Sequence, residues 1–201
     1  MPTVGRTSTS GFTNWNSNTG SNNQVASKLT MPETGLIKTL HVYVSGNGST
    51  ITGQLVLWDS AGHILGQTGN ITFSSGGTGL GGQALQSADL LTPVVVSSGA
   101  TIYIGFWRAS ASTANYSWVN SGGIISPDPG GTQADVASPG NLAIGSTATG
   151  QLTAYADYVK GGLAYYTGSA WNKYALKRYN GTAFQRHPLK RWSGSTWEWY
   201  A

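Results

Sequence analysis

The chain has 201 residues, a net charge of +4 and no cysteine, and only 9% of its residues are charged. This length accommodates one sizeable domain with an appendage, and the lack of cysteine excludes disulfides and thiolate metal sites. Gly is abundant at 29 residues, and eight Trp and ten Tyr supply apolar surface, so the composition is typical of an all-β protein and excludes intrinsic disorder.

Short alternating strands separated by Gly-rich turns follow a polar N-terminal segment. We interpret residues 1–25 as an N-terminal arm or as the first edge strand of a sandwich. A series of short strands at regular spacing predicts a β-sandwich. No window shows helical periodicity. The predicted strands cover residues 26–31, 36–44, 55–58, 63–66, 91–96, 101–107 and 152–159.

A change in charge divides the chain near residue 160. Residues 1–159 carry four basic and six acidic side chains, whereas residues 160–201 carry seven basic side chains and one acidic one. Residues 121–150, with three Pro and many Gly, are predicted to form a long surface loop. We therefore expect a β-sandwich over residues 26–160 and a separate basic module over residues 161–201.

Three near-copies of a 13-residue unit make up most of this basic module. A fixed spacing of this kind predicts a repeated structural unit, here a β-hairpin. In each unit one aromatic residue precedes the turn and another follows five positions later, so the two rings are expected to meet across the strands, directly or diagonally. The ring positions are Tyr166 and Trp171, Tyr179 and Phe184, and Trp192 and Trp197.

Each predicted turn contains a glycine. Asn180-Gly181 favours a two-residue type I′ turn, because that turn needs positive φ at both central positions. Gly168 and Gly194 take the equivalent places. An isolated hairpin is marginal in water, so three of them need a cover for their rings, either the sandwich or copies of the same chain. We favour assembly with other copies, as a homotrimer.

Basic residues recur between the turns of the repeats. They form either a solvated strand face that discourages sheet aggregation or a surface for an anionic partner. Nucleic acid is not expected to be that partner, because the interleaved rings are assigned to hairpin packing. The basic positions are Lys173, Lys177, Arg178, Arg186, Lys190 and Arg191.

The sequence gives no support for catalysis, and we expect neither enzyme activity nor a cofactor. The chain has only two Glu, Glu33 and Glu198, and five Asp, with no pair placed to hydrolyse a glycosidic bond. A Gly-x-Ser-x-Gly motif, a metal-ligand spacing of the three His, and a phosphate-binding loop are all lacking. The absence of a long apolar stretch also predicts no membrane span.

Aromatic residues outside the repeats are the candidates for a binding site. Flat rings with an arginine nearby suit stacking on sugars, and such a group is found at Trp107, Arg108, Tyr116 and Trp118. The alternative interpretation is that these rings close the core of the sandwich.

The predicted sandwich strands and the repeats together resemble a family of viral proteins. The segments 32–44, 55–62 and 93–106 resemble jelly-roll modules found in bacteriophage tail and fibre proteins and in some bacterial carbohydrate-binding proteins. The closing repeats resemble those at the ends of minor tail proteins of tailed phages that infect actinobacteria. The fold class that this implies is all-β, a jelly-roll-like β-sandwich followed by an array of short hairpins.

The same resemblance implies a non-enzymatic virion protein at the tail or tail tip, in contact with other virion proteins and with a possible host-surface glycan. A capsid decoration protein and a stand-alone carbohydrate-binding module are the alternatives. Residues 1–6 lack the apolar region of a signal peptide, so we expect synthesis in the host cytoplasm and location in the virion.

Overall fold

The computed structural model describes most of the predicted sandwich and the strands of the C-terminal repeats. The described residues are 1–8, 10–18, 24–76, 79, 82–108, 114–127, 139–142, 144, 148–160, 163–166, 171–174, 177–179, 184–186, 189–192 and 197–200. For 14–18, 115, 118–127, 148–149 and every residue after 160, the description is of the backbone.

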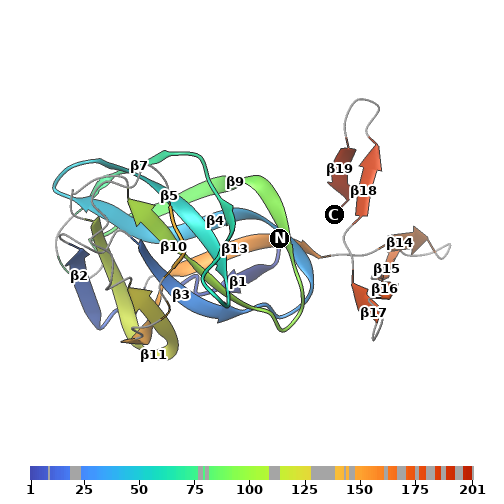
Figure 1. Cartoon of the computed structure of the whole chain (residues 1–201), viewed down its shortest axis with the longest axis horizontal. Coiled ribbons are helices and arrows are strands. Elements are labelled where there is room, and N and C mark those ends of the chain that lie inside the picture. Colours follow the sequence, from blue (N-terminus) through green and yellow to red (C-terminus); the bar gives the residue numbers. More distant parts are fainter. Residues whose placement is uncertain are drawn as a thin grey trace.

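All regular elements of the described residues are strands, and thirteen of them form the sandwich (Figure 1). They are β1 Thr3–Gly5, β2 Asn14–Asn18, β3 Gln24–Thr30, β4 Gly35–Asn47, β5 Ile51–Asp59, β6 Ile64–Gln67, β7 Ile71–Phe73, β8 Ser75–Gly76, β9 Leu85–Val96, β10 Thr101–Arg108, β11 Ala114–Pro127, β12 Ala148–Leu152 and β13 Ala154–Lys160. The predicted all-β sandwich is confirmed.

The strands form two antiparallel sheets that share one long strand. Sheet A has the order β1-β13-β4-β9, and sheet B contains the path β11-β3-β10-β5-β6, with β2 and β12 beside β11 and β7 beside β5. The first nine residues of β4 pair with β13 and β9, whereas Val44–Gly46 pair with β11 and Gly46–Asn47 with the short β8. Because β4 crosses from one sheet to the other, the two sheets are joined through one continuous backbone.

Strand β10 shows how the alternation of the sequence builds both sides of sheet B. Ile104 and Phe106 point into the main core between the sheets, and Tyr103 and Trp107 belong to a second apolar cluster on the outer side. Between them, Gly105 lies against β3 so closely that an added Cβ would be 1.9 Å from the Val25 carbonyl oxygen. A side chain at this position would therefore separate two central strands.

The second cluster is covered by a short segment, residues 139–142, which we call the strap. The Trp58 indole Nε1 donates to the Gly140 carbonyl at 3.0 Å, and the Leu142 amide donates to the Gly62 carbonyl at 2.8 Å. Leu142 is 3% exposed and packs in this cluster.

The prediction of one surface loop over residues 121–150 is wrong in three places. Strand β11 continues to Pro127, β12 begins at Ala148, and the strap is pinned to sheet B. The predicted strand 152–159 is also two strands, because Thr153 separates β12 from β13. The Pro and Gly content of residues 121–150 predicted an irregular path. Pairing with strands far away in the sequence instead holds parts of this segment in the sheets.

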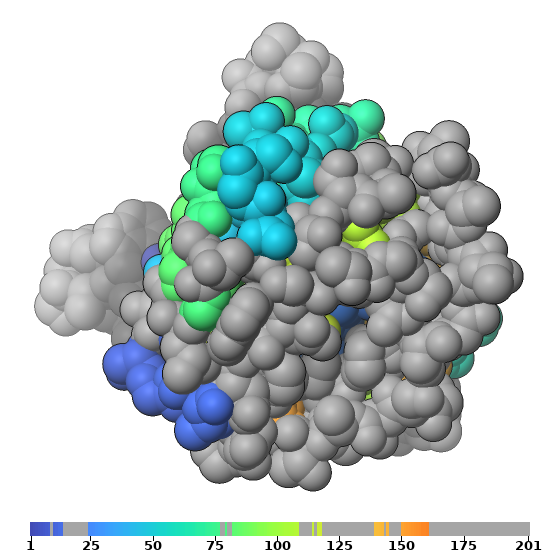
Figure 2. All heavy atoms as spheres, turned by 90° about the vertical axis from the view of Figure 1, so that its left-hand side faces the viewer, coloured from blue at the N-terminus to red at the C-terminus, as the bar shows by residue number. Residues whose placement is uncertain are grey.

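The N-terminal segment contributes an edge strand to sheet A. Thr3 pairs with Asp157, and the Tyr158 amide donates to the Pro2 carbonyl at 3.1 Å. Of residues 1–25, which the sequence left open between an arm and an edge strand, Thr3–Gly5 form the edge strand β1. The chain enters and leaves the sandwich at the same end, while Figure 2 shows the other end, where the region of the β4–β5 connection (cyan) lies at the surface.

The C-terminal repeats form three separate two-stranded sheets. None of their strands pairs with the sandwich or with another hairpin in the described residues. Their strands are β14 Leu163–Tyr166 with β15 Trp171–Tyr174, β16 Lys177–Tyr179 with β17 Phe184–Arg186, and β18 Leu189–Trp192 with β19 Trp197–Tyr200.

Candidate functional site

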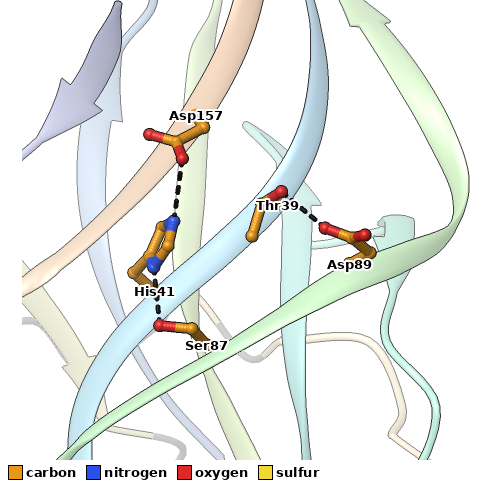
Figure 3. A network of polar contacts seen from close by, with 5 residues as sticks. All are labelled: Thr39, His41, Ser87, Asp89 and Asp157. Atoms are coloured by element: carbon orange, nitrogen blue, oxygen red, sulfur yellow. Dashed lines mark hydrogen bonds and ion pairs between the residues drawn. The ribbon is translucent and has the colours of Figure 1, made fainter. Parts of the chain in front are cut away.

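The outer side of sheet A carries a cluster of polar side chains from three neighbouring strands (Figure 3). Strand β4 supplies Thr39 and His41, β9 supplies Ser87 and Asp89, and β13 supplies Asp157. Antiparallel register brings them together, because His41 lies opposite Ser87 on β9, and Thr39 lies between Asp89 and Asp157. The cluster is therefore a consequence of the sheet topology.

His41 is the centre of this cluster. Its Nδ1 lies 2.7 Å from the Ser87 hydroxyl and its Nε2 lies 3.2 Å from Asp157 Oδ2. The imidazole also stacks on the Tyr155 ring, with the centroids 4.3 Å apart and the planes at 10°. Burial and the negative charge of Asp157 raise the pKa of Tyr155, so this phenol stays protonated at neutral pH.

The order Ser87–His41–Asp157 matches the hydrogen-bond order of a hydrolytic triad, but its surroundings do not suit acyl transfer. Such a reaction needs hydrogen-bond donors at the developing oxyanion. Here Asp89 lies two residues from Ser87 on β9, and Asp157 is on the other side of His41. The carboxylate of Asp89 would repel an oxyanion near Ser87, and the two carboxylates together favour hydrogen-bond donors and cations at this surface.

Apolar side chains accompany this polar cluster along β9. Leu85 is 44% exposed and Leu91 is 69% exposed, and between them lie the half-buried Gln86 and Ala88 and the buried Leu90. Leu85 therefore lies on the same side of β9 as Ser87 and Asp89, and Leu91 is exposed just beyond Asp89, where the pairing of β9 with β4 shifts its register. We call this surface the outer face of sheet A, comprising Thr39, His41, Tyr155, Asp157, Leu85, Ser87, Asp89 and Leu91.

Sequence reasoning missed this surface because its members lie far apart in the chain. His41 and Asp157 are 116 positions apart, and each, taken alone, resembles an ordinary strand residue. The available signal was the alternation of polar residues along the predicted strands 36–44 and 152–159, which indicates a solvent-facing side. Alternation does not identify which strands become neighbours.

The predicted glycan-binding residues have a different environment from the one that sugar stacking requires. Trp107 is 1% exposed, Arg108 is fully buried and Tyr116 is 4% exposed. Trp107 packs in the cluster beside the strap, and Tyr116 packs at a tilt against Phe106. Buried rings cannot stack on a sugar, so the alternative interpretation, in which the rings close the sandwich, fits Trp107 and Tyr116.

Arg108 and Trp118 complete that predicted set. Burial lowers the pKa of the Arg108 guanidinium, the expected effect of removing a cation from water. The backbone of Trp118 pairs with Leu152 and Asn14, and its side chain lies outside the described residues. The four residues therefore form no described solvent-facing group.

The aromatic positions of the repeats are direct cross-strand partners. Tyr166 lies opposite Trp171, Tyr179 opposite Phe184, and Trp192 opposite Trp197. Of the two arrangements expected from the spacing, the backbone register is the direct one. It leaves four residues between the members of each pair, and the predicted turn at Asn180-Gly181 falls among the four that separate Tyr179 from Phe184. The turn positions Gly168, Gly181 and Gly194 lie outside the described residues.

The basic positions of the repeats are distributed over the hairpin strands β15 to β18. Lys177 lies directly opposite Arg186, a like-charged pair, whereas Arg191 lies opposite Glu198. Like charges at directly opposite positions destabilise a strand pair. The other three basic positions of the repeats, Lys173, Arg178 and Lys190, each lie opposite an uncharged residue.

No protein family and no curated protein matches this sequence. Within the described residues, there is no helix with the length and hydropathy needed to cross a membrane. The same residues contain no group of three or more His, Asp or Glu side chains arranged to hold a metal ion.

Proposed function

We propose that this chain is a non-enzymatic structural protein of a tailed-bacteriophage virion, located at the tail or tail tip. The sandwich forms its stable body, and the basic hairpin module attaches it to other copies and to neighbouring virion proteins. A host-surface glycan is a further partner under this proposal.

The pairing within the hairpin module carries the proposal. Each hairpin has two strands of three or four residues and shares no strand pairing with another described element. A two-stranded hairpin of this size is marginal in water, and each one here aligns an aromatic residue with an aromatic residue. Such units become stable when another surface covers their rings, which is the property of an assembly module.

Disruption of one ring pair tests the assembly role. The double substitution Tyr179→Ser and Phe184→Ser removes the pair while leaving the sandwich unchanged. The matched control, Asn172→Ser and Gln185→Ser, changes two strand positions of the same module outside the ring pairs. Native mass spectrometry should give an oligomer, a trimer in our proposal, for the wild type and the control, and a monomer for the ring-pair variant.

Localisation tests the virion role separately. Antibodies against the sandwich should label the tail or tail tip of purified virions, at a low copy number per particle. Labelling over the whole head at hundreds of copies would instead indicate a capsid decoration protein. A monomer that binds a polysaccharide and is not found on virions would indicate a stand-alone carbohydrate-binding module.

A further inference from the structure

We propose that the outer face of sheet A is the docking surface for the basic hairpin module of a neighbouring copy of this chain. This inference rests on the proposed assembly function and names the surface that the module covers. Its support is charge complementarity and the exposed apolar side chains of that face.

The outer face of sheet A combines two carboxylates with apolar surface, and one cation, the half-buried Lys38, adjoins Thr39 on β4. Asp89 and Asp157 lie on either side of Thr39 at the same level of the sheet. Leu91, at 69% exposed, lies two positions beyond Asp89 on β9. An aromatic, basic partner would bury the leucine side chain and bring its cations near both carboxylates.

The module has the complementary composition. Residues 160–201 carry seven basic side chains against one acidic side chain, and six aromatic residues occupy the ring pairs. Lys177 opposite Arg186 leaves two cations together with no acid at the neighbouring register positions of that hairpin. The strand register places these two cations opposite each other. Carboxylates from a surface outside the hairpin would reduce the repulsion between them.

The path of the chain favours a neighbouring copy over the module's own sandwich. Strand β13 runs toward Lys160, which lies level with Gly35 of β4 and, through it, with Val96 of β9. Only two residues separate Lys160 from the start of the first hairpin at Leu163. Because β13 runs away from the level of Asp89 toward Lys160, the first hairpin follows the end of the sheet that lies farther from the two carboxylates.

Contacts of this kind join two different surfaces, so they propagate from copy to copy. A module-to-face contact is heterologous and closes into a ring when its rotation allows. A ring of three copies is compatible with the trimer proposed above, in which every module and every outer face is covered.

Full-length variants with a matched control test the docking surface. Leu91→Arg adds one positive charge to the face, and Thr52→Arg adds the same charge at an exposed position of sheet B. Sedimentation at several protein concentrations should show the dissociation constant of the oligomer rising roughly tenfold or more for Leu91→Arg. Thr52→Arg should change it by less than about twofold.

A charge exchange provides the second measurement. Asp89→Lys should weaken assembly, and adding Lys177→Glu and Arg186→Glu to the same chain should restore part of the affinity. Wild-type assembly should also weaken when the salt concentration is raised, because the Debye length falls from about 8 Å at 0.15 M to about 3 Å at 1 M.

The outcomes separate this inference from the proposed function. If Leu91→Arg and Asp89→Lys assemble as tightly as the wild type while the ring-pair variant dissociates, the proposed docking surface is wrong. The assembly role of the module would then remain intact. A wild-type chain that stays monomeric at every concentration would overturn docking between copies, and virion labelling would still decide the proposed function. The docking surface would be supported if Leu91→Arg and Asp89→Lys weaken assembly, Thr52→Arg does not, and the charge exchange restores part of the affinity lost in Asp89→Lys.

Discussion

The sandwich and the hairpin module have similar residue types but differ in how their strands are packed together. In the sandwich, side chains from both sheets share one core, where Leu40, Leu57 and Phe106 are fully buried. In the module, the described strands pair only within their own hairpin. The same aromatic-rich, Gly-rich composition thus gives a shared core in one region and separate two-stranded hairpins in the other, which are marginal in water unless a surface covers them, as we propose.

The largest effect is expected from removing a ring at the centre of the sandwich core. Phe106 meets Phe73 edge-on at 6.0 Å and Tyr116 at 5.8 Å between centroids. Phe106→Ala should lower the free energy of unfolding by about 3–5 kcal/mol, because it removes buried surface and leaves a cavity. Chemical denaturation followed by near-ultraviolet circular dichroism measures this loss, and a change below about 1 kcal/mol would contradict a single shared core.

The next effect compares two glycines of the sandwich. Gly105→Ala should destabilise by about 1–3 kcal/mol or more, since the added Cβ would collide with backbone atoms of Val25 and Ala26. Gly69→Ala is the control, because the nearest atom to its added Cβ is a side-chain carbon of Leu91 at 3.9 Å. Thermal unfolding of both variants checks the difference, and equal losses would contradict the close approach of β10 and β3.

A smaller effect concerns the end of the sandwich where the module begins. The Tyr158 hydroxyl donates to Glu33 at 2.9 Å, and Glu33 pairs with Lys160 at 2.7 Å. Burial, followed by the hydrogen bond and charge of Glu33, raises the pKa of Tyr158 to about 12. A folded-state pKa above the unfolded value of 10.0 contributes stability at lower pH, which is lost as the pH rises from about 10 to 12.

Substitution of Tyr158 tests this linkage. Tyr158→Phe should lose about 1 kcal/mol at pH 7. It should also flatten the decline in unfolding free energy between pH 10 and 12, relative to wild type. Denaturation curves at a series of pH values measure both changes, and an unchanged alkaline slope would show that another group controls it.

The smallest effect on the sandwich is expected from removing the module altogether. A chain ending at Lys160 keeps every strand of both sheets, so at protein concentrations low enough for the full chain to be monomeric, the two free energies of unfolding should differ by less than about 0.5 kcal/mol. A substantially lower stability would show that the module covers part of its own sandwich and would weaken the contrast between the two regions.

The sequence predicted where the strands of this fold lie better than it predicted which strands pair with one another. Residues 101–107 alternate between two apolar sets, and the structure has β10 over Thr101–Arg108. The spacing of the repeats likewise predicted the hairpins and their ring pairs. The strap could not be predicted, because its attachment to Trp58 depends on a contact across 82 positions.

The candidate surface shows the same limit more strongly. Trp107 and Tyr116 attracted attention as aromatic residues near polar turns, yet both face packed interiors. Asp89 and Asp157 belong to no sequence motif. They reach the same level of the sheet only because β9 and β13 lie on either side of β4. Residue type indicates what chemistry is available, and long-range pairing decides where it is assembled.

The adjacency of β1 and β13 determines how a mechanical load would act on this protein. Pro2 and Tyr158 are hydrogen-bonded neighbours, so the two connections of the sandwich leave side by side. Tension between them would peel β1 from β13 one hydrogen bond at a time, starting at Pro2 and Tyr158 and continuing to Thr3 and Asp157, while the rest of the sheets stayed unloaded. An anchor at this end would also leave the end seen in Figure 2 turned away from it, so the sandwich could be held firmly through its module alone.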